Sequence, residues 1–310
     1  MQKIFCIIIL STFVKYLSRT DFLICLAIIE TNKRFSTMTA TIDKMSLLQQ
    51  LNKPYTLSSE NIAFYRENGY VKLKNVLSAQ IIEHYGELIT DLVFKLNKLT
   101  KPMEERTTYE KAFLQVMNLW EENEEAKEFV FSKRLAQIAT ELMGVSGVRL
   151  YHDQALYKEP SGGITPFHAD QFYWPLSNNN TVTAWIPLQE TPMEMGPLAF
   201  AEKSQEVEIG RDKEISDESE AILSETLKQF TMNEAPFDLG EVSFHSGWTY
   251  HRAGANVSGK ARKVMTMIYM DKDIKVIEPT NKYRTADWER WLCSKEISTV
   301  ADGKLNPVLY

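Results

Sequence analysis

A histidine and an aspartate stand two residues apart at His168 and Asp170. On an extended backbone, side chains at this spacing leave by the same face with Cα atoms about 6.6 Å apart, so both can reach one ion. Two imidazoles and one carboxylate form the facial triad that suits iron(II) and leaves positions for a bidentate co-substrate and dioxygen. A His-x-Asp pair alone is weak evidence, so the prediction depends on a second histidine.

The third ligand is expected well downstream, and His245 and His251 are the two candidates. Six residues along an unbroken strand span about 20 Å, so the two histidines are not expected to serve the same ion. We favour His251, because Gly254 to Gly259 then provide a turn and the chain returns as a strand that opens with Arg262. His245 is interpreted as a histidine that lies near the site without binding the metal.

Arg262 follows His251 by eleven residues. Its planar guanidinium can bind the distal carboxylate of 2-oxoglutarate through two hydrogen bonds, while the other end of that molecule chelates iron. The alternative is a surface salt bridge at the start of a strand.

Strand candidates dominate the second half of the chain. From Val148 the hydrophobic period is two residues, which predicts that Gln154 faces the same way as Val148 and Leu150. Further candidates, separated by turn-forming residues, are Thr181–Leu188, Leu198–Ala201, Val242–Tyr250 and Lys263–Asp271. This succession predicts a mainly β protein with a β-sandwich or jelly-roll core.

The first half is predicted to be helical and to serve as scaffold. Ser58 is a suitable N-cap for a helix over 59–68, which Gly69 closes. Ser78 caps a longer helix with one apolar stripe, and residues 124–143 repeat that pattern.

Two further segments carry open alternatives. Residues 203–234 form an acidic insertion, predicted to be helical from about Asp217, which is either a lid over a site or a solvated surface helix. Phe172, Tyr173 and Trp174 directly follow the His-x-Asp pair and form either a substrate wall or ordinary sheet packing.

Composition narrows the class of protein. The 310 residues are 25% charged and 44% hydrophobic with a net charge of −6, which suits a globular domain and disfavours nucleic-acid binding. The cysteines Cys6, Cys25 and Cys293 are odd in number and far apart, so neither a zinc site nor a disulfide framework is expected. A reducing, cytoplasmic compartment fits best.

Residues 1–45 differ from the rest and are predicted to be a hydrophobic extension. Apolar runs at 4–14 and 22–29 are separated by charges, so neither reaches membrane-spanning length. The extension is either a secretory signal, with Ala27 near the cleavage point, or an upstream segment outside the mature fold. Membrane association is expected only if the extension is retained, and the functional domain is expected over 57–310.

With these residues in place, the chain resembles the phytanoyl-CoA dioxygenase family from about Leu57 to Tyr310. The resemblance is specific because several short motifs occur together. These are His152-Asp153-Gln154 leading to Lys158-Glu159-Pro160, His168-Ala169-Asp170-Gln171, Thr183-Ala184-Trp185, Gly196-Pro197-Leu198, and His251 with Arg262.

The resemblance implies a double-stranded β-helix of the cupin type, iron(II), 2-oxoglutarate and dioxygen, and hydroxylation of an unactivated carbon. It also implies that Gln115, Gln154 and Trp185 line the co-substrate pocket. Trp185 lies in a predicted strand, where core packing is the alternative role.

The chain departs from the family pattern at Ala253, where members often carry a hydroxyl residue that helps to hold the co-substrate carboxylate. Arg262 is therefore expected to need another partner. Asp170 is retained, whereas halogenating relatives replace it, so hydroxylation is favoured. The last residues, 307–310, are not a peroxisomal targeting tripeptide, so an acyl-CoA substrate is not implied.

The sequence thus predicts an oxygenase that hydroxylates a small organic or lipid-like molecule. The alternative is a non-catalytic jelly-roll protein that keeps the metal site as a sensor or structural module. The identity of the substrate lies in loops and in the insertion, which vary without changing the core reaction.

Overall fold

The computed structural model describes residues 44–310. The chain divides into two units, 1–49 and 50–310, and the two sheets lie in the second unit. The expectations for the hydrophobic runs at 4–14 and 22–29 fall outside the described residues. Among residues 44–310, no helix is long and apolar enough to cross a membrane.

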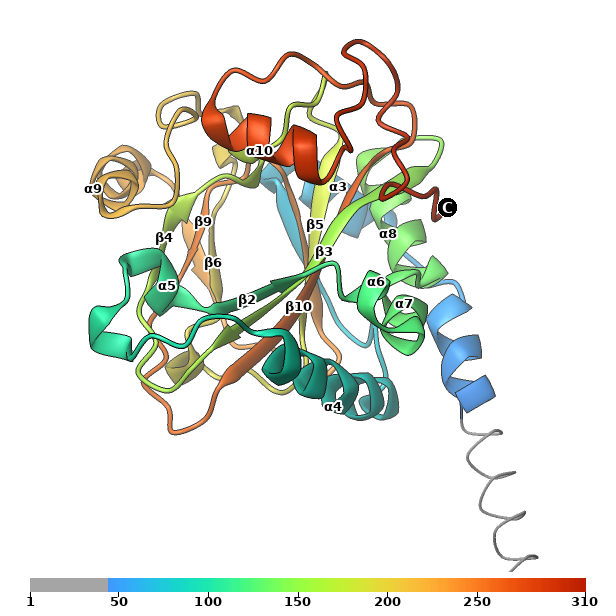
Figure 1. Cartoon of the computed structure of the whole chain (residues 1–310), viewed down its shortest axis with the longest axis horizontal. Coiled ribbons are helices and arrows are strands. Elements are labelled where there is room, and N and C mark those ends of the chain that lie inside the picture. Colours follow the sequence, from blue (N-terminus) through green and yellow to red (C-terminus); the bar gives the residue numbers. More distant parts are fainter. Residues whose placement is uncertain (1–43) are drawn as a thin grey trace, which may run out of the picture. The chain divides into compact units, whose positions relative to one another are not determined.

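Two antiparallel sheets form the centre of the 50–310 unit (Figure 1). The larger sheet has six strands, in the order β1(Tyr70–Leu73), β8(Val242–Ser246), β5(Thr181–Pro187), β10(Arg262–Asp271), β3(Val148–Lys158) and β2(Leu114–Met117). The smaller has four, in the order β4(Thr165–His168), β9(His251–Ala253), β6(Leu198–Ala201) and β7(Met232–Glu234). The predicted mainly β architecture with a helical annex is confirmed.

Helices surround the sheets, with α10 at the upper end of the view in Figure 1 and α4 at the lower end. Their bounds are α3(Ser59–Asn68), α4(Ala79–Leu96), α5(Thr108–Ala112), α6(Leu119–Glu122), α7(Glu124–Val130), α8(Lys133–Met143), α9(Asp217–Thr226) and α10(Lys282–Arg290). Ser58 caps α3 as predicted, and Gly69 ends it in the left-handed region at φ 81°. The single helix predicted over 124–143 is two helices, because Ser132 caps a new one through the amide of Leu135.

The predicted strand Val242–Tyr250 is interrupted. β8 ends at Ser246, a turn follows, and the chain resumes as β9 at His251 in the other sheet. Gly247 lies in this turn so close to the side chains of Gln171 and Thr181 that a Cβ atom would collide with both. An unbroken strand would hold His245 and His251 far apart. The turn instead places β8 and β9 in the two facing sheets.

β3 carries a β-bulge at Tyr151, where its pairing with β10 shifts register. His152 lies opposite Ile268, whereas Leu150 lies opposite Tyr269. Directly opposed residues share a face and successive residues alternate, so the bulge reverses the faces of β3 along its length.

This reversal corrects one expectation. Gln154 does not face the same way as Val148 and Leu150, because it lies beyond the bulge and opposite Thr266. It shares a face with His152, toward the space between the sheets. The periodicity argument failed because one extra residue changes the phase of the alternation.

Candidate metal centre and cofactor cavity

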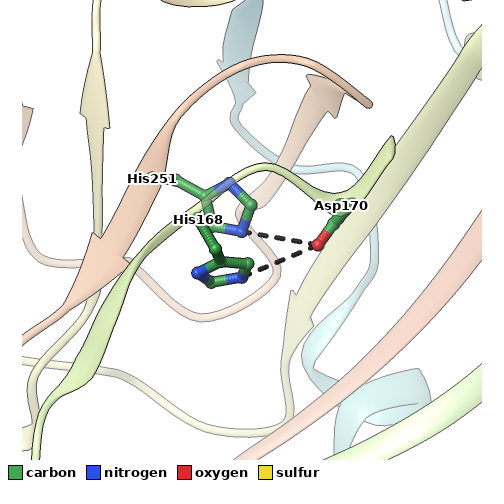
Figure 2. A group of neighbouring side chains, drawn as sticks. All are labelled: His168, Asp170 and His251. Atoms are coloured by element: carbon green, nitrogen blue, oxygen red, sulfur yellow. Dashed lines mark ion pairs between the residues drawn. The ribbon is translucent and has the colours of Figure 1, made fainter. Parts of the chain in front are cut away.

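His168, Asp170 and His251 come together between the two sheets (Figure 2). His168 ends β4 and lies opposite His251 on β9, while Asp170 opens a short 3-10 helix, Asp170–Tyr173. The Nε2 atoms of His168 and His251 lie 3.6 and 3.8 Å from Oδ1 of Asp170. One ligand atom from each residue lies within 4.8 Å of the other two, so a single ion can contact all three.

Both imidazoles are oriented as metal ligands. Nδ1 of His168 donates to the carbonyl of Pro166 over 2.7 Å, and Nδ1 of His251 donates to the carbonyl of Thr249 over 2.9 Å. Since Nδ1 carries the proton, the Nε2 lone pair points toward the centre. Burial lowers the pKa of both histidines, which keeps them neutral and able to bind a cation.

The two carboxylate oxygens of Asp170 make different contacts. Oδ1 faces the imidazoles, whereas Oδ2 accepts hydrogen bonds from Thr183 Oγ1 at 2.7 Å and from His245 Nε2 at 3.2 Å. Burial acts to raise the pKa of Asp170, but the neighbouring histidines, His251 first, outweigh it and lower that pKa. The carboxylate is therefore held ionised and in one orientation.

The distance argument that separated the two candidate histidines is wrong. Ring centroids of His245 and His251 lie only 4.3 Å apart, because the turn after Ser246 folds the chain back. What distinguishes them is orientation: the Nε2 atom of His245 is engaged by Asp170, and its Nδ1 has no hydrogen-bond partner among the described residues.

Arg262 is buried, with 2% of its surface exposed, so the alternative of a surface salt bridge is excluded. Its guanidinium donates to the carbonyl of Gly196 and lies over the ring of Trp185, 5.4 Å from the centroid. Within residues 44–310 it forms no ion pair, and its Nε has no hydrogen-bond partner. Burial lowers its pKa to about 9, so it stays charged at neutral pH and needs an anion.

Lys158 lies opposite Arg262 and is fully buried. Its Nζ donates to the carbonyls of Gly163 and Gly254, each over 2.7 Å, and lies 3.3 Å from Thr165 Oγ1. Burial, and then the charge of Arg262, lower the pKa of Lys158 to about 6, so it is largely neutral at pH 7. Arg262 is left as the buried cation at this end of the site.

One cavity of about 260 Å³ joins the His168, Asp170 and His251 cluster to Arg262. The three residues that the family resemblance nominated, Gln115, Gln154 and Trp185, all line it. The side-chain amide of Gln115 donates to that of Gln154 over 2.5 Å, and Tyr109 Oη donates to Gln115 over 2.9 Å. Trp185 also packs against Phe237 in a hydrophobic cluster. It therefore both lines the cavity and contributes to the hydrophobic core.

The aromatic residues after the His-x-Asp pair have both of the proposed roles, as cavity wall and as packing residues. Tyr173 and Trp174 line the cavity. Phe172 is buried and packs on the rings of Tyr173 and Tyr283. In the insertion, Ile215 lines the cavity and its amide donates to Tyr173 Oη, whereas α9 packs on β4.

Sequence reasoning placed His245 near the site but did not give it its bond to Asp170, and it gave no role to Thr183, Thr165 or Lys158. Thr183 bonds to Asp170, Lys158 lies opposite Arg262, and Thr165 Oγ1 lies 3.3 Å from Lys158 Nζ. Thr183 carried a usable signal, because the two-residue period places it on the same face as Trp185.

The donor set fits the groups that the sequence implied. Two neutral imidazoles and one ionised carboxylate suit iron(II), and a buried guanidinium with an unpartnered Nε suits a carboxylate anion. The fold and site therefore define an iron- and 2-oxoglutarate-dependent oxygenase. Residues 65–264 match the family model "Phytanoyl-CoA dioxygenase (PhyH)", and the chain belongs to that family.

Solved structures share this fold. The non-heme alpha ketoglutarate dependent carbocyclase SnoK from nogalamycin biosynthesis is 25% identical, with a TM-score of 0.69, over 84% of this chain and 100% of that chain. The epimerase SnoN, in complex with Fe3+, alpha ketoglutarate and nogalamycin RO, is 24% identical, with a TM-score of 0.68, over 81% and 98%. EctD from S. alaskensis, with 2-oxoglutarate and 5-hydroxyectoine, is 16% identical, with a TM-score of 0.59, over 74% and 83%.

These structures confirm the double-stranded β-helix fold. The family match and the His168, Asp170 and His251 donor set support iron and 2-oxoglutarate as the cofactors. The SnoN structure contains both Fe3+ and alpha ketoglutarate. Two of these similar structures are an epimerase and a carbocyclase, so the fold also supports chemistry other than hydroxylation.

Proposed function

We propose that this protein hydroxylates a small organic or lipid-like substrate, with iron(II) held by His168, Asp170 and His251 and 2-oxoglutarate anchored by Arg262. The observation that carries the proposal is the buried guanidinium of Arg262, which forms no ion pair within residues 44–310 and lines the same cavity as the histidine and aspartate cluster. When bound, iron, 2-oxoglutarate and dioxygen supply the oxidising chemistry, and 2-oxoglutarate leaves as succinate and carbon dioxide.

The protein's own residues fix the geometry of that chemistry. The carbonyls of Pro166 and Thr249 set the tautomers of the two histidines. Thr183 and His245 fix Asp170 through Oδ2 and leave Oδ1 for the metal.

The co-substrate end contains a substitute for the hydroxyl that is missing at position 253. Thr165 lies directly opposite Ala253 across the β4 and β9 pair and lines the cavity. We assign Thr165 as the partner that helps Arg262 to hold the distal carboxylate. Gln115, Gln154 and Trp185 complete the walls around the co-substrate.

The presence of Asp170 supports hydroxylation over halogenation, because its carboxylate would occupy the position that a halide needs. It is tested by turnover under ¹⁸O₂ with mass spectrometry of the product. One incorporated oxygen atom is expected; a ring closure or epimerisation without oxygen gain would overturn hydroxylation and leave the oxygenase class intact.

The cofactor assignment is tested first and needs no substrate. Anaerobic addition of 2-oxoglutarate to the iron(II)-loaded protein is expected to give a metal-to-ligand charge-transfer band. No band, with iron demonstrably bound, would favour the non-catalytic alternative. If the band is present, a screen of metabolites for succinate formation would identify the substrate.

A further inference from the structure

The cavity extends past the metal centre, away from Arg262, to a wall formed by β3 and α10. Asp287 of α10 and His152 of β3 both line this end. Together with Arg290, they are side chains of the cavity lining that the cofactor assignment leaves without a role.

Asp287 has spare capacity to accept hydrogen bonds. Tyr151 Oη donates to its Oδ2 over 2.8 Å, and within residues 44–310 no donor contacts Oδ1. Arg290, three residues further on, stacks over the ring of Trp291 at 4.2 Å and forms no ion pair with Asp287. Asp287 is half-buried and lines the cavity, so a ligand that fills this end can donate a hydrogen bond to Oδ1 in place of water.

His152 is a second and independent unpartnered group. It is 4% exposed and its Nδ1 has no hydrogen-bond partner among the described residues. Its ring lies between those of Tyr151 and Trp291, with centroids 5.2 and 5.1 Å away. Burial lowers the pKa of His152 to about 3, so the ring is neutral and one of its nitrogens accepts a hydrogen bond.

Apart from Arg290, the neighbouring walls are mainly apolar and include Met117, Trp174, Ile215, Ile268 and Trp291. The pattern is therefore an apolar chamber with hydrogen-bond acceptors at one wall. Moreover α10, which carries Asp287, lies outside the stretch 65–264 that the family model matches. The end of the cavity that would select a substrate is thus lined in part by residues outside the matched region.

We infer that Asp287 is a specificity-determining residue that accepts a hydrogen bond from an amine or hydroxyl group on an otherwise apolar substrate, with His152 as its neighbour. The inference rests on the proposed function, because it assigns the substrate end of the same cavity. A donor at Asp287 would hold the substrate so that a carbon elsewhere on its skeleton lies beside the metal centre.

The test uses three probes with one skeleton: cyclohexylmethylamine, cyclohexylmethanol and cyclohexanecarboxylate. Each is titrated anaerobically into the full-length protein loaded with iron(II) and 2-oxoglutarate, and its Kd is read from the change in the charge-transfer band. The amine or the alcohol is expected to bind at least tenfold more tightly than the carboxylate, because only these two bring a donor to Asp287.

Asp287→Asn then separates the two donor classes. A cationic amine loses its ion pair and is expected to bind at least tenfold more weakly, whereas an alcohol that bonds to the remaining carbonyl oxygen changes less than threefold. Glu289→Gln, on the same helix but not in the cavity lining, is the matched control and is expected to leave every Kd unchanged.

Three equal affinities, no binding of amine or alcohol, or an Asp287→Ala variant, which keeps no acceptor, that binds each probe as the parent does would overturn the inference, provided that 2-oxoglutarate still gives the band. Absence of the band in the parent protein would instead overturn the proposed function. The two failures are therefore distinguishable.

Discussion

The imidazole of His245 lies 3.2 Å from Oδ2 of Asp170, so a histidine next to the candidate ligands holds the carboxylate rather than the ion. Its ring is 4.3 Å from that of His251, close enough that proximity alone does not identify the ligand. The hydrogen bonds identify the ligand, because a backbone carbonyl fixes the Nδ1 of His251 and the Nε2 of His251 faces the centre.

His251→Ala is therefore expected to abolish iron binding, because only two protein ligands remain. His245→Ala is expected to retain iron with an affinity about 10- to 100-fold lower, as is typical when a group that orients a ligand is lost. Equilibrium dialysis with elemental analysis measures both. Full iron loss in His245→Ala, with iron kept in His251→Ala, would reverse the assignment.

Thr183→Val removes the second hydrogen bond to Oδ2 of Asp170 while nearly preserving shape. Iron affinity is expected to fall about 10-fold or more, since the carboxylate can then rotate. Thr266→Val is the matched control, because its hydroxyl lines the same cavity but donates to the carbonyl of Gln154. Equal effects of the two variants on iron affinity would argue against a positioning role for Thr183.

Arg262→Ala is expected to keep iron and lose 2-oxoglutarate affinity by about 2–5 kcal/mol, the range for one partner of a buried, hydrogen-bonded charge pair. The charge-transfer band titrated with 2-oxoglutarate gives that affinity. Arg66→Ala, at an exposed arginine in the last turn of α3, serves as the control. Unchanged affinity in Arg262→Ala would remove this residue from the site.

Lys158 gives a pH prediction for stability. Its pKa is about 6 in the folded protein and about 10.4 in an unfolded chain, so between these values the unfolded chain binds more protons. The contribution of Lys158 to the free energy of unfolding therefore rises with pH across this window, by at most about 1.4 kcal/mol per unit, and is constant below about pH 6.

Urea unfolding at pH 6, 7.5 and 9 measures this dependence without 2-oxoglutarate. Lys158→Met is expected to flatten it, because the titrating group is gone. An identical slope in parent and variant would show that Lys158 stays charged, or is hydrated, in the folded protein.

Local patterns predicted the parts of the site that depend on few residues. The two-residue spacing of His168 and Asp170 was sufficient, because Ala169 between them is extended, at φ −126° and ψ 130°. The strand Leu198–Ala201 and the helix start at Asp217 were also found by their boundary residues.

The parts that sequence reasoning missed depend on contacts between distant segments. The turn after Ser246 is required by the approach of Gly247 to other elements, which no local pattern reveals. Likewise Thr165 gains its place through pairing opposite Ala253, and α10 reaches the cavity through tertiary packing. Strands of three or four residues, such as β4 and β7, are too short to show a period.

The bulge at Tyr151 sets a rule for redesigning this protein. In β3, the positions that line the cavity are 152, 154 and 156, all even-numbered, whereas the even-numbered positions before the bulge face the other way. A library that randomises every second residue of the strand from Val148 onward would thus change the packing face first and the cavity only later. Because Tyr151 is the extra residue, deleting it would make a regular ladder in which Leu150 stays opposite Tyr269 and His152 stays opposite Ile268. A β3 strand shortened by this one residue would therefore keep Gln154 facing the cavity, and its cavity-lining face could then be read from simple alternation.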